Sequence, residues 1–465
     1  MSNADFVRYN MSCIRKDKEG VRLSNTRILP VLPLLVLLCL WLPATVMADH
    51  EVPPPVPLQP IIDRMAEGEA LRLADQTYQG PVTIQKAVSI EGTGGAKLLN
   101  DTSKSAVTVE ADGARLQGFQ ITHNGNGDAA AVEIRADRVN VSQLAIRTNG
   151  YGILLRDANH AVLNDNDISW FEADSGHPEN KGNGIDLYSS NHNLILDNRI
   201  AYMKDAIYLE KGRNETVKGN RVSHSRYGIH LMYIDDSQVT DNTGDYNFTG
   251  AMVMVVSNAT VSDNSFRRQS GNVNSQGILL YDVRKSRIER NALEGNRVGV
   301  YMENAAENRI SDNDFIRNFI GIQMIRSKAN MIRHNVFAAN VIEASEQESG
   351  SNRLTGNYWD SFQGLDVTND GISEMPYSIR PFYQNVIARN SAYQLFFQSP
   401  GMNFLSDMFA GGDQAAKDVA PLMNMESRTE AGNGRRTEDS SAAAAAGWAL
   451  LVAATSIMIL GGIRK

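Results

Sequence analysis

A segment of about 22 residues recurs along most of this chain, and no other feature limits the possible folds as strongly. The aligned copies begin at Gly184, Ala206, Gly228, Gly250, Gly277, Gly299 and Gly321. Units of this length are too short to bury an apolar face alone, so they fold by stacking on one another. The repeat therefore predicts a solenoid of similar coils.

An asparagine stands fourteen positions after the start of each copy and of the segments on either side. The column comprises Asn166, Asn198, Asn220, Asn242, Asn264, Asn291, Asn313, Asn335 and Asn357. In stacked coils, a buried asparagine hydrogen-bonds to the neighbouring coils and satisfies turn amides that apolar side chains leave unpaired. We interpret the column as structural and assign no catalytic role to it.

Apolar residues alternate with other residues at the start of each copy, as in Ile207 and Leu209. A period of two is typical of strands whose alternate side chains point inward. The Leu-x-x-Leu-x-Leu pattern of leucine-rich repeats is missing. We therefore predict an all-β, right-handed parallel β-helix of about twelve coils over residues 80–365, with coils about 4.8 Å apart.

The flanking regions are predicted to close the two open ends, where strand edges would otherwise be exposed. Residues 49–79 contain a short amphipathic helix and a strand that form an N-terminal cap. Residues 366–410 are assigned to a C-terminal cap and a partner-docking extension. Residues 411–441 are polar and are predicted to be a flexible linker.

Both termini of the chain carry apolar segments. The run at 28–42 follows basic residues and precedes a small-residue cleavage signal, so residues 1–48 are predicted to be a signal peptide. Residues 442–465 are long and uncharged enough to form a transmembrane tail, with a helix packed on protein as the alternative. The predicted location is the periplasm, with a tether to the inner membrane.

Charge and cysteine usage exclude several functions. The net charge is −8, with 45 basic and 53 acidic residues, and no basic stripe is present, so nucleic acid is not an expected partner. Both cysteines, Cys13 and Cys39, precede the predicted cleavage site. The exported protein would contain neither thiolate ligands nor disulfides.

Two insertions, at 171–183 and 267–276, interrupt the repeat in the same sector of the coil. We expect them to emerge from one side of the solenoid. Two explanations fit this pattern: the insertions contact a partner protein, or they have changed by neutral drift and have no function.

Three thioethers and one imidazole occupy outward positions of two successive copies. In-register stacking places His230 beside Met252 and Met232 beside Met254. Soft sulfur and imidazole ligands suit Cu(I), so these four residues are the candidate metal ligands. The same methionines would also form an adaptable apolar patch for docking another protein.

A β-helix that binds or modifies acidic polysaccharides is the alternative function. Such enzymes need paired carboxylates or bound calcium beside Arg or Lys. Asp186, Asp205 and Glu210 with Lys211 are candidates, but such charges are more often solvated turn residues. We predict no catalytic residue and favour binding over catalysis.

A sequence signature follows the last copy, at residues 356–377 (GNYWDSFQGLDVTNDGISEMPY). It resembles the C-terminal signature of the NosD family and of related carbohydrate-binding and sugar-hydrolase-like repeats. The matching residues are Gly356, Asn357, Tyr358, Trp359, Gly364, Asp366, Asp370, Gly371, Ile372, Pro376 and Tyr377. The chain departs from the family pattern at 360–362 and at 373–374.

The resemblance implies a periplasmic subunit on a membrane complex with an ABC-type ATPase and permease similar to NosF and NosY. It further implies a role in assembling the copper-sulfur centre of nitrous oxide reductase, with copper supplied by a lipoprotein chaperone. No resident cofactor is expected, and copper(I) would be bound transiently.

Overall fold

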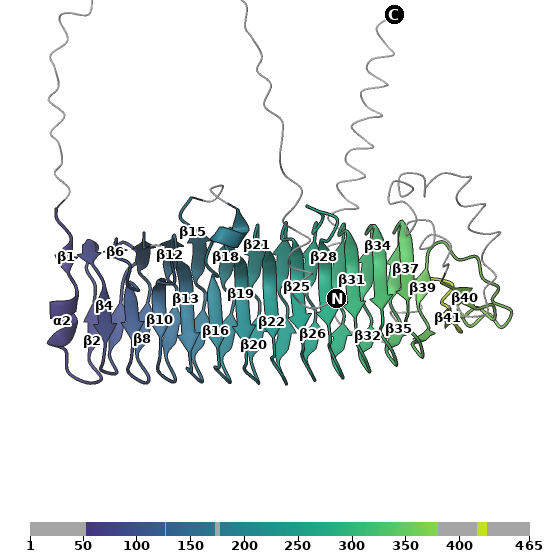
Figure 1. Cartoon of the computed structure of the whole chain (residues 1–465), viewed down its shortest axis with the longest axis horizontal. Coiled ribbons are helices and arrows are strands. Elements are labelled where there is room, and N and C mark those ends of the chain that lie inside the picture. Colours follow the sequence, from purple (N-terminus) through teal and green to yellow (C-terminus); the bar gives the residue numbers. More distant parts are fainter. Residues whose placement is uncertain (1–52, 126, 173–176, 380–415, 426–465) are drawn as a thin grey trace, which may run out of the picture. The chain divides into compact units, whose positions relative to one another are not determined.

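The computed structural model describes residues 53–125, 127–172, 177–379 and 416–425. The described residues from Pro54 onward form one compact unit, an all-β parallel β-helix of about 14 turns (Figure 1). The predicted fold class is confirmed. The turns outnumber the predicted twelve because coiling starts before residue 80, where Val56–Pro57 (β1) already pairs with Thr77–Gln79 (β3).

Several predicted segments lie wholly or largely outside the described residues. They are the signal peptide (1–48), the transmembrane tail (442–465) and residues 380–410 of the docking extension. Within the described part of the chain, no helix is long and apolar enough to cross a membrane.

Most coils contribute one strand to each of three sheets, and all the strand pairs are parallel except that of β40 with β41. Sheet A contains β1, β3, β6 (Lys97–Asn100), β9 (Gln120–His123), β12 (Ala145–Thr148), β15 (Asp167–Trp170), β18 (Arg199–Ala201), β21 (Arg221–Ser223), β24 (Thr243–Asp245), β27 (Ser265–Arg267), β30 (Ala292–Glu294), β33 (Asp314–Ile316), β36 (Val336–Ala338) and β39 (Tyr358–Trp359). Sheet B contains β2 (Ala70–Arg72), β5 (Ser89–Glu91), β8 (Arg115–Gln117), β11 (Asn140–Ser142), β14 (Val162–Asn164), β17 (Leu194–Leu196), β20 (Thr216–Lys218), β23 (Gln238–Thr240), β26 (Thr260–Ser262), β29 (Arg287–Glu289), β32 (Arg309–Ser311), β35 (Met331–Arg333), β38 (Arg353–Thr355), β41 (Lys417–Asp418) and β40 (Tyr377–Ser378). Sheet C contains β4 (Val82–Ile84), β7 (Val107–Val109), β10 (Ala130–Ile134), β13 (Tyr151–Arg156), β16 (Ile185–Tyr188), β19 (Asp205–Glu210), β22 (Tyr227–Met232), β25 (Thr249–Met254), β28 (Gln276–Tyr281), β31 (Val298–Glu303), β34 (Ile320–Ile325) and β37 (Ile342–Gln347).

The core runs along the inside of the three sheets. Alternate residues of the strands point inward, and Ile207, Leu209, Ile229 and Leu231 are each 0% exposed, as the alternation predicts. Burial of such a side chain contributes about 1.5–3 kcal/mol, and the repeat multiplies this gain along the stack. At the N-terminal end, the short helix α2 (Gln59–Asp63) buries Ile62 against the same core.

The asparagine column forms a continuous hydrogen-bonded ladder inside the turn between sheets B and A. The Asn242 Oδ1 accepts hydrogen bonds from the backbone N of Asn220 at 2.9 Å and from its Nδ2 at 3.0 Å. The Asn242 Nδ2 donates in turn to the carbonyl of Val217 at 2.9 Å and to Asn264. The predicted structural role of the column is confirmed.

Two further ladders, which the sequence did not reveal, occupy the other two turns. One includes Asn193, Glu215 and Ser237, where the Glu215 carboxylate accepts from the backbone N of Asn193 at 3.0 Å. The other includes Asn247 and Gln269, where Gln269 accepts from Asn247 and donates to the carbonyl of Gly244. Asn, Ser, Gln and Glu alternate in these columns, so no single letter marks them.

The C-terminal end is closed by aromatic rings and by a distant carboxylate. Tyr377 stacks on Trp359 with ring centroids 4.3 Å apart, and Trp359 stacks on Phe337 at 4.2 Å. Asp418, 0% exposed, accepts from the Nδ2 of Asn357 at 2.8 Å and from the Nε1 of Trp359 at 3.1 Å. Lys417–Asp418 (β41) therefore belongs to the cap, although it lies in the range 411–441 that the sequence predicts as a linker.

Candidate functional site

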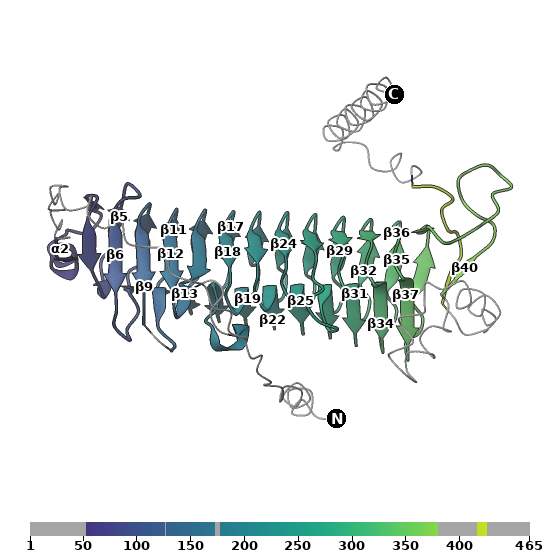
Figure 2. The ribbon, with the colours of Figure 1, turned by 90° about the horizontal axis from the view of Figure 1, so that it is seen from above.

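The candidate ligands belong to β22 and β25 of sheet C and occupy the outward positions of these strands. Figure 2 shows β19, β22 and β25 side by side, and β28 follows next in the sheet. His230 pairs with Met252, and Met232 pairs with Met254, as in-register stacking predicts. Residues two apart on a strand share a face, and neighbouring strands lie about 4.8 Å apart. The four side chains therefore share one small area, which we call the His-Met patch.

His230 is more enclosed than an outward position suggests, since it is only 6% exposed. Its Nδ1 lies 2.9 Å from the Oδ2 of Asp205. The rings of Tyr208 and Tyr227 meet the imidazole edge-on, with centroids 4.9 and 5.0 Å away. The Nε2 is buried and has no hydrogen-bond partner among the described residues.

Asp205 holds the imidazole in place. It is 1% exposed, and its carboxylate also accepts from the Nε and Nη2 of Arg226, both at 2.9 Å. Burial alone would raise the pKa of the Asp205 carboxyl, but hydrogen bonds and charges from His230 and Arg226 hold it below its usual range. The ionised carboxylate accepts from Nδ1–H, and in the tautomer that carries its proton on Nδ1 the lone pair of the ring lies on Nε2.

The thioethers border this imidazole on the outward side. Met232, Met252 and Met254 are half-buried. The hydroxyl of Tyr208 lies 3.5 Å from the sulfur of Met232 and donates to Glu210 at 2.7 Å. In the described part of the chain, no group of three or more His, Cys, Asp or Glu residues could hold a metal. The available donors are therefore one nitrogen and up to three sulfurs, a soft set.

Arg226 also connects the patch to the first insertion. Its Nη1 lies 3.0 Å from the Oε2 of Glu179, in the short helix η2 (Pro178–Asn180), while its other nitrogens hold Asp205. One guanidinium therefore bridges the insertion and the carboxylate that orients His230.

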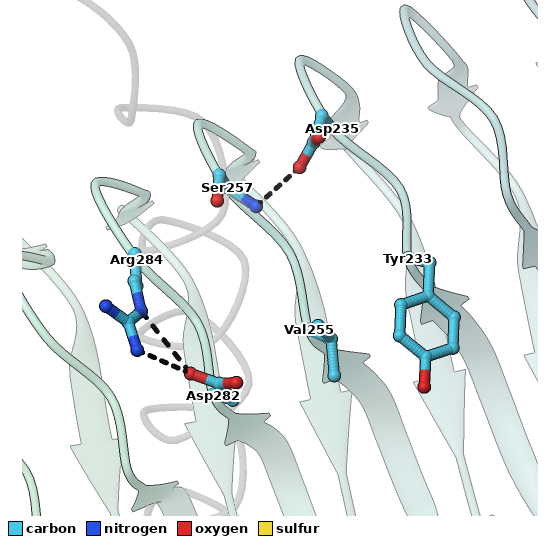
Figure 3. A pocket seen from close by; sticks show the side chains of 6 residues that line it. All are labelled: Tyr233, Asp235, Val255, Ser257, Asp282 and Arg284. Atoms are coloured by element: carbon cyan, nitrogen blue, oxygen red, sulfur yellow. Dashed lines mark hydrogen bonds and ion pairs between the residues drawn. The ribbon is translucent and has the colours of Figure 1, made fainter.

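An open groove of about 290 Å³ lies at the end of the same strands, immediately after Met232, Met254 and Tyr281 (Figure 3). Tyr233 and Val255 line it from neighbouring coils. Val255 has φ = +53°, which is unusual for a β-branched residue and costs about 1–3 kcal/mol. The turn thereby directs an apolar side chain into the groove beside the patch.

The two insertions meet on the opposite edge of sheet C, as the sequence predicts. Pro178 and Lys181 from the first, with Arg268 and Gly271 from the second, line a hollow of about 390 Å³. This hollow and the groove lie on either side of the His-Met patch.

The sequence located the four patch residues and missed Tyr227. It named Asp205 only as a candidate for the alternative function and favoured a solvated turn charge, which is wrong because Asp205 is 1% exposed and holds His230. Asp205 and Tyr227 both occupy the strand position just before the repeat start, and the next coils have Thr249 and Gln276 there. No recurring residue marks this position. The only signal for this contact in the sequence was a combination of two residue types: an acidic residue one coil before an outward histidine.

A comparison with protein-family models bears on the whole repeat. The model described as periplasmic copper-binding protein (NosD) matches residues 82–209 and 169–364. The chain belongs to the NosD family. The matched ranges span the coils from β4 to β39 and include the whole His-Met patch. The NosD description supports a periplasmic location and a copper-related role.

Solved structures similar to this NosD-family chain include enzymes that act on polysaccharides. The A-module of mannuronan C-5 epimerase AlgE6 from Azotobacter vinelandii is 15% identical, with a TM-score of 0.49, over 63% of this chain and 94% of that one. The family 28 exopolygalacturonase of Yersinia enterocolitica is 12% identical, with a TM-score of 0.47, over 64% and 74%. Similarity at this level carries no information on activity. None of the curated proteins matches the chain.

Proposed function

We propose that this NosD-family chain is a periplasmic accessory protein that handles Cu(I) during assembly of the copper-sulfur centre of nitrous oxide reductase. His230 would supply a nitrogen ligand, and Met232, Met252 and Met254 would supply thioethers. The observation that carries the proposal is the buried Nε2 of His230, which no described residue satisfies. A buried polar atom without a partner is costly, and a bound ion would remove that cost.

The arrangement around His230 suits a metal ligand. Histidines that bind metals usually donate their other ring N–H to a carboxylate, which fixes the tautomer and raises the basicity of the ligating nitrogen. Asp205 occupies that position. Neutral thioethers bind Cu(I) in preference to harder ions. The patch would therefore hold Cu(I) without the cysteine thiolates that tighter copper sites contain.

The solenoid would also act as a docking scaffold. We propose that it contacts an ABC-type ATPase and permease similar to NosF and NosY, a copper chaperone lipoprotein and nitrous oxide reductase. Family membership and the two insertions on one side of the coils support this arrangement. Binding without catalysis is part of the same proposal.

An anaerobic Cu(I) titration against a chromogenic chelator tests the copper proposal. We expect wild-type protein to compete for one Cu(I), and His230→Gln and the triple change Met232→Leu, Met252→Leu, Met254→Leu each to weaken binding about 10- to 100-fold. X-ray absorption of the complex should report both nitrogen and sulfur neighbours. Both variants keep side-chain size, so the coil should be retained.

Met331→Leu is the matched control, because Met331 is also half-buried but lies in β35 of sheet B. Its Cu(I) affinity should equal that of wild type. Failure of the wild-type protein to bind Cu(I), or unchanged binding by the triple variant, would refute the ligand assignment. The patch would then be a methionine-rich docking surface.

Polysaccharide binding or modification is the second candidate. Asp186, 5% exposed, lies one coil before Tyr208 and pairs with Arg156 at 2.7 Å. Burial raises the pKa of the Asp186 carboxyl, as in many acid-base residues. Turnover of mannuronan or polygalacturonate that is lost in Asp186→Asn would favour this candidate over the copper proposal.

A further inference from the structure

The hollow between the two insertions is built around a ladder of rings. Tyr202, His224 and Tyr246 come from successive coils, and their ring centroids are 4.7 and 5.3 Å apart. The Arg268 guanidinium continues the ladder, since it lies 5.4 Å from the Tyr246 ring and donates to its hydroxyl at 2.5 Å. We call this hollow, with its ladder, the ladder pocket.

The turn does not require these side chains. Tyr202, His224 and Tyr246 have φ values of +62°, +54° and +58°, in the left-handed region that favours glycine or asparagine. Two coils later the same turn position is occupied by Gly295. The same left-handed backbone is adopted at Arg317 and Ala339 in later coils, so the fold sets the conformation of the turn but does not require ring side chains there.

The charge of the ladder pocket is opposite to that of the chain. Acidic residues outnumber basic ones, 53 to 45. The described residues that line the pocket nevertheless include Lys181, His224 and Arg268 and no aspartate or glutamate. A wall of this kind attracts anions.

The rings also limit the chemistry of the occupant. Sugars bind best on open aromatic faces, but these faces are already stacked on one another, so edges and hydroxyl groups are presented instead. Tyr and Arg are the residue types enriched at the centres of protein interfaces. A carboxylate-bearing peptide therefore fits the pocket better than a saccharide does.

We propose that the ladder pocket binds an acidic segment of a partner protein. The exposed Arg268 would pair with one of its carboxylates, and the ring edges would contact its apolar or aromatic side chains. The inference deepens the proposed function, because the Glu179–Arg226–Asp205 ion pairs connect this edge to His230. Its test contains no copper and can therefore fail separately from the Cu(I) titration.

Fluorescence anisotropy with two labelled peptides tests the proposal on the purified whole protein. The probes are Glu-Glu-Tyr-Glu-Glu and its uncharged match Gln-Gln-Tyr-Gln-Gln. We expect the acidic peptide to bind, the glutamine peptide to bind at least about tenfold more weakly, and Arg268→Gln to lose about tenfold in affinity for the acidic peptide. Arg268 is exposed, so this change should leave the coil intact.

Arg317→Gln is the matched control. Arg317 is exposed at the same left-handed turn position farther along the solenoid and does not line the pocket. Its affinity for the acidic peptide should be that of wild type. The proposal is overturned by no binding up to about 1 mM peptide, by equal binding of both peptides, or by full affinity in Arg268→Gln. Displacement of the peptide by trigalacturonate at lower concentration would assign the pocket to acidic saccharides instead.

Discussion

Replacement of Asn242 by leucine should lower the free energy of unfolding by about 4 kcal/mol. The side chain is 0% exposed and is hydrogen-bonded to the coils on both sides. Leucine would leave the backbone N of Asn220 without its acceptor and would remove one hydrogen bond each from the carbonyl of Val217 and from the side chain of Asn264. Each such buried group costs about 1–3 kcal/mol. Guanidinium unfolding followed by circular dichroism measures the loss as a lower midpoint.

The neighbouring Thr243→Ala provides the control, because Thr243 is exposed on sheet A. Its effect should stay within about 0.5 kcal/mol. Equal unfolding midpoints for Asn242→Leu and the control would mean that the ladder does not contribute to stability as its geometry indicates.

Glu215→Gln should stabilise the protein at pH 8 by up to about 4 kcal/mol and have little effect at pH 5. Glu215 is 1% exposed, and burial raises the pKa of its carboxyl to about 8 from the usual 4.5. The folded state therefore binds more protons than the unfolded state between these pH values. The contribution of Glu215 to stability is therefore greatest below pH 4.5 and falls as pH rises towards 8.

Gln269 shows that glutamine suits such a position in the neighbouring ladder, since its Oε1 accepts from the backbone N of Asn247 and its Nε2 donates to the carbonyl of Gly244 in the same preceding coil. Thermal unfolding of both proteins from pH 5 to pH 8 measures the effect. The two curves should converge at low pH and separate at high pH. Exposed Glu307→Gln is the control and should run parallel to wild type; parallel curves for Glu215→Gln would show that Glu215 does not titrate in this range.

Local periodicity was enough to predict the solenoid and the arrangement of its faces. Inward Ile229 and Leu231, the Asn242 ladder and the pairing of His230 with Met252 all follow from one register, because a regular repeat places equivalent residues one above another. In such a fold, the position of a residue within its repeat unit determines which face of the solenoid it occupies.

The sequence was less informative wherever a contact depended on a residue outside the pattern. Asp205 orients His230 from a strand position where other coils have different residue types, so no column marked it. Asp418 reaches Asn357 from 61 residues away in a polar stretch that composition alone assigns to a linker. The amino-acid composition of a segment describes only its average polarity, so it could not identify the one buried carboxylate that ends the asparagine ladder.

The closing role of Asp418 has a consequence for how these molecules coexist. A parallel β-helix without its last cap presents three strand edges and an open row of stacked rings, which is a template for another molecule of the same kind. Asp418 satisfies the last asparagine and Trp359, and β41 pairs with the edge of β38. The residues around Asp418 thus cover the edge of sheet B, one of the three edges on which a second copy could add its strands end to end.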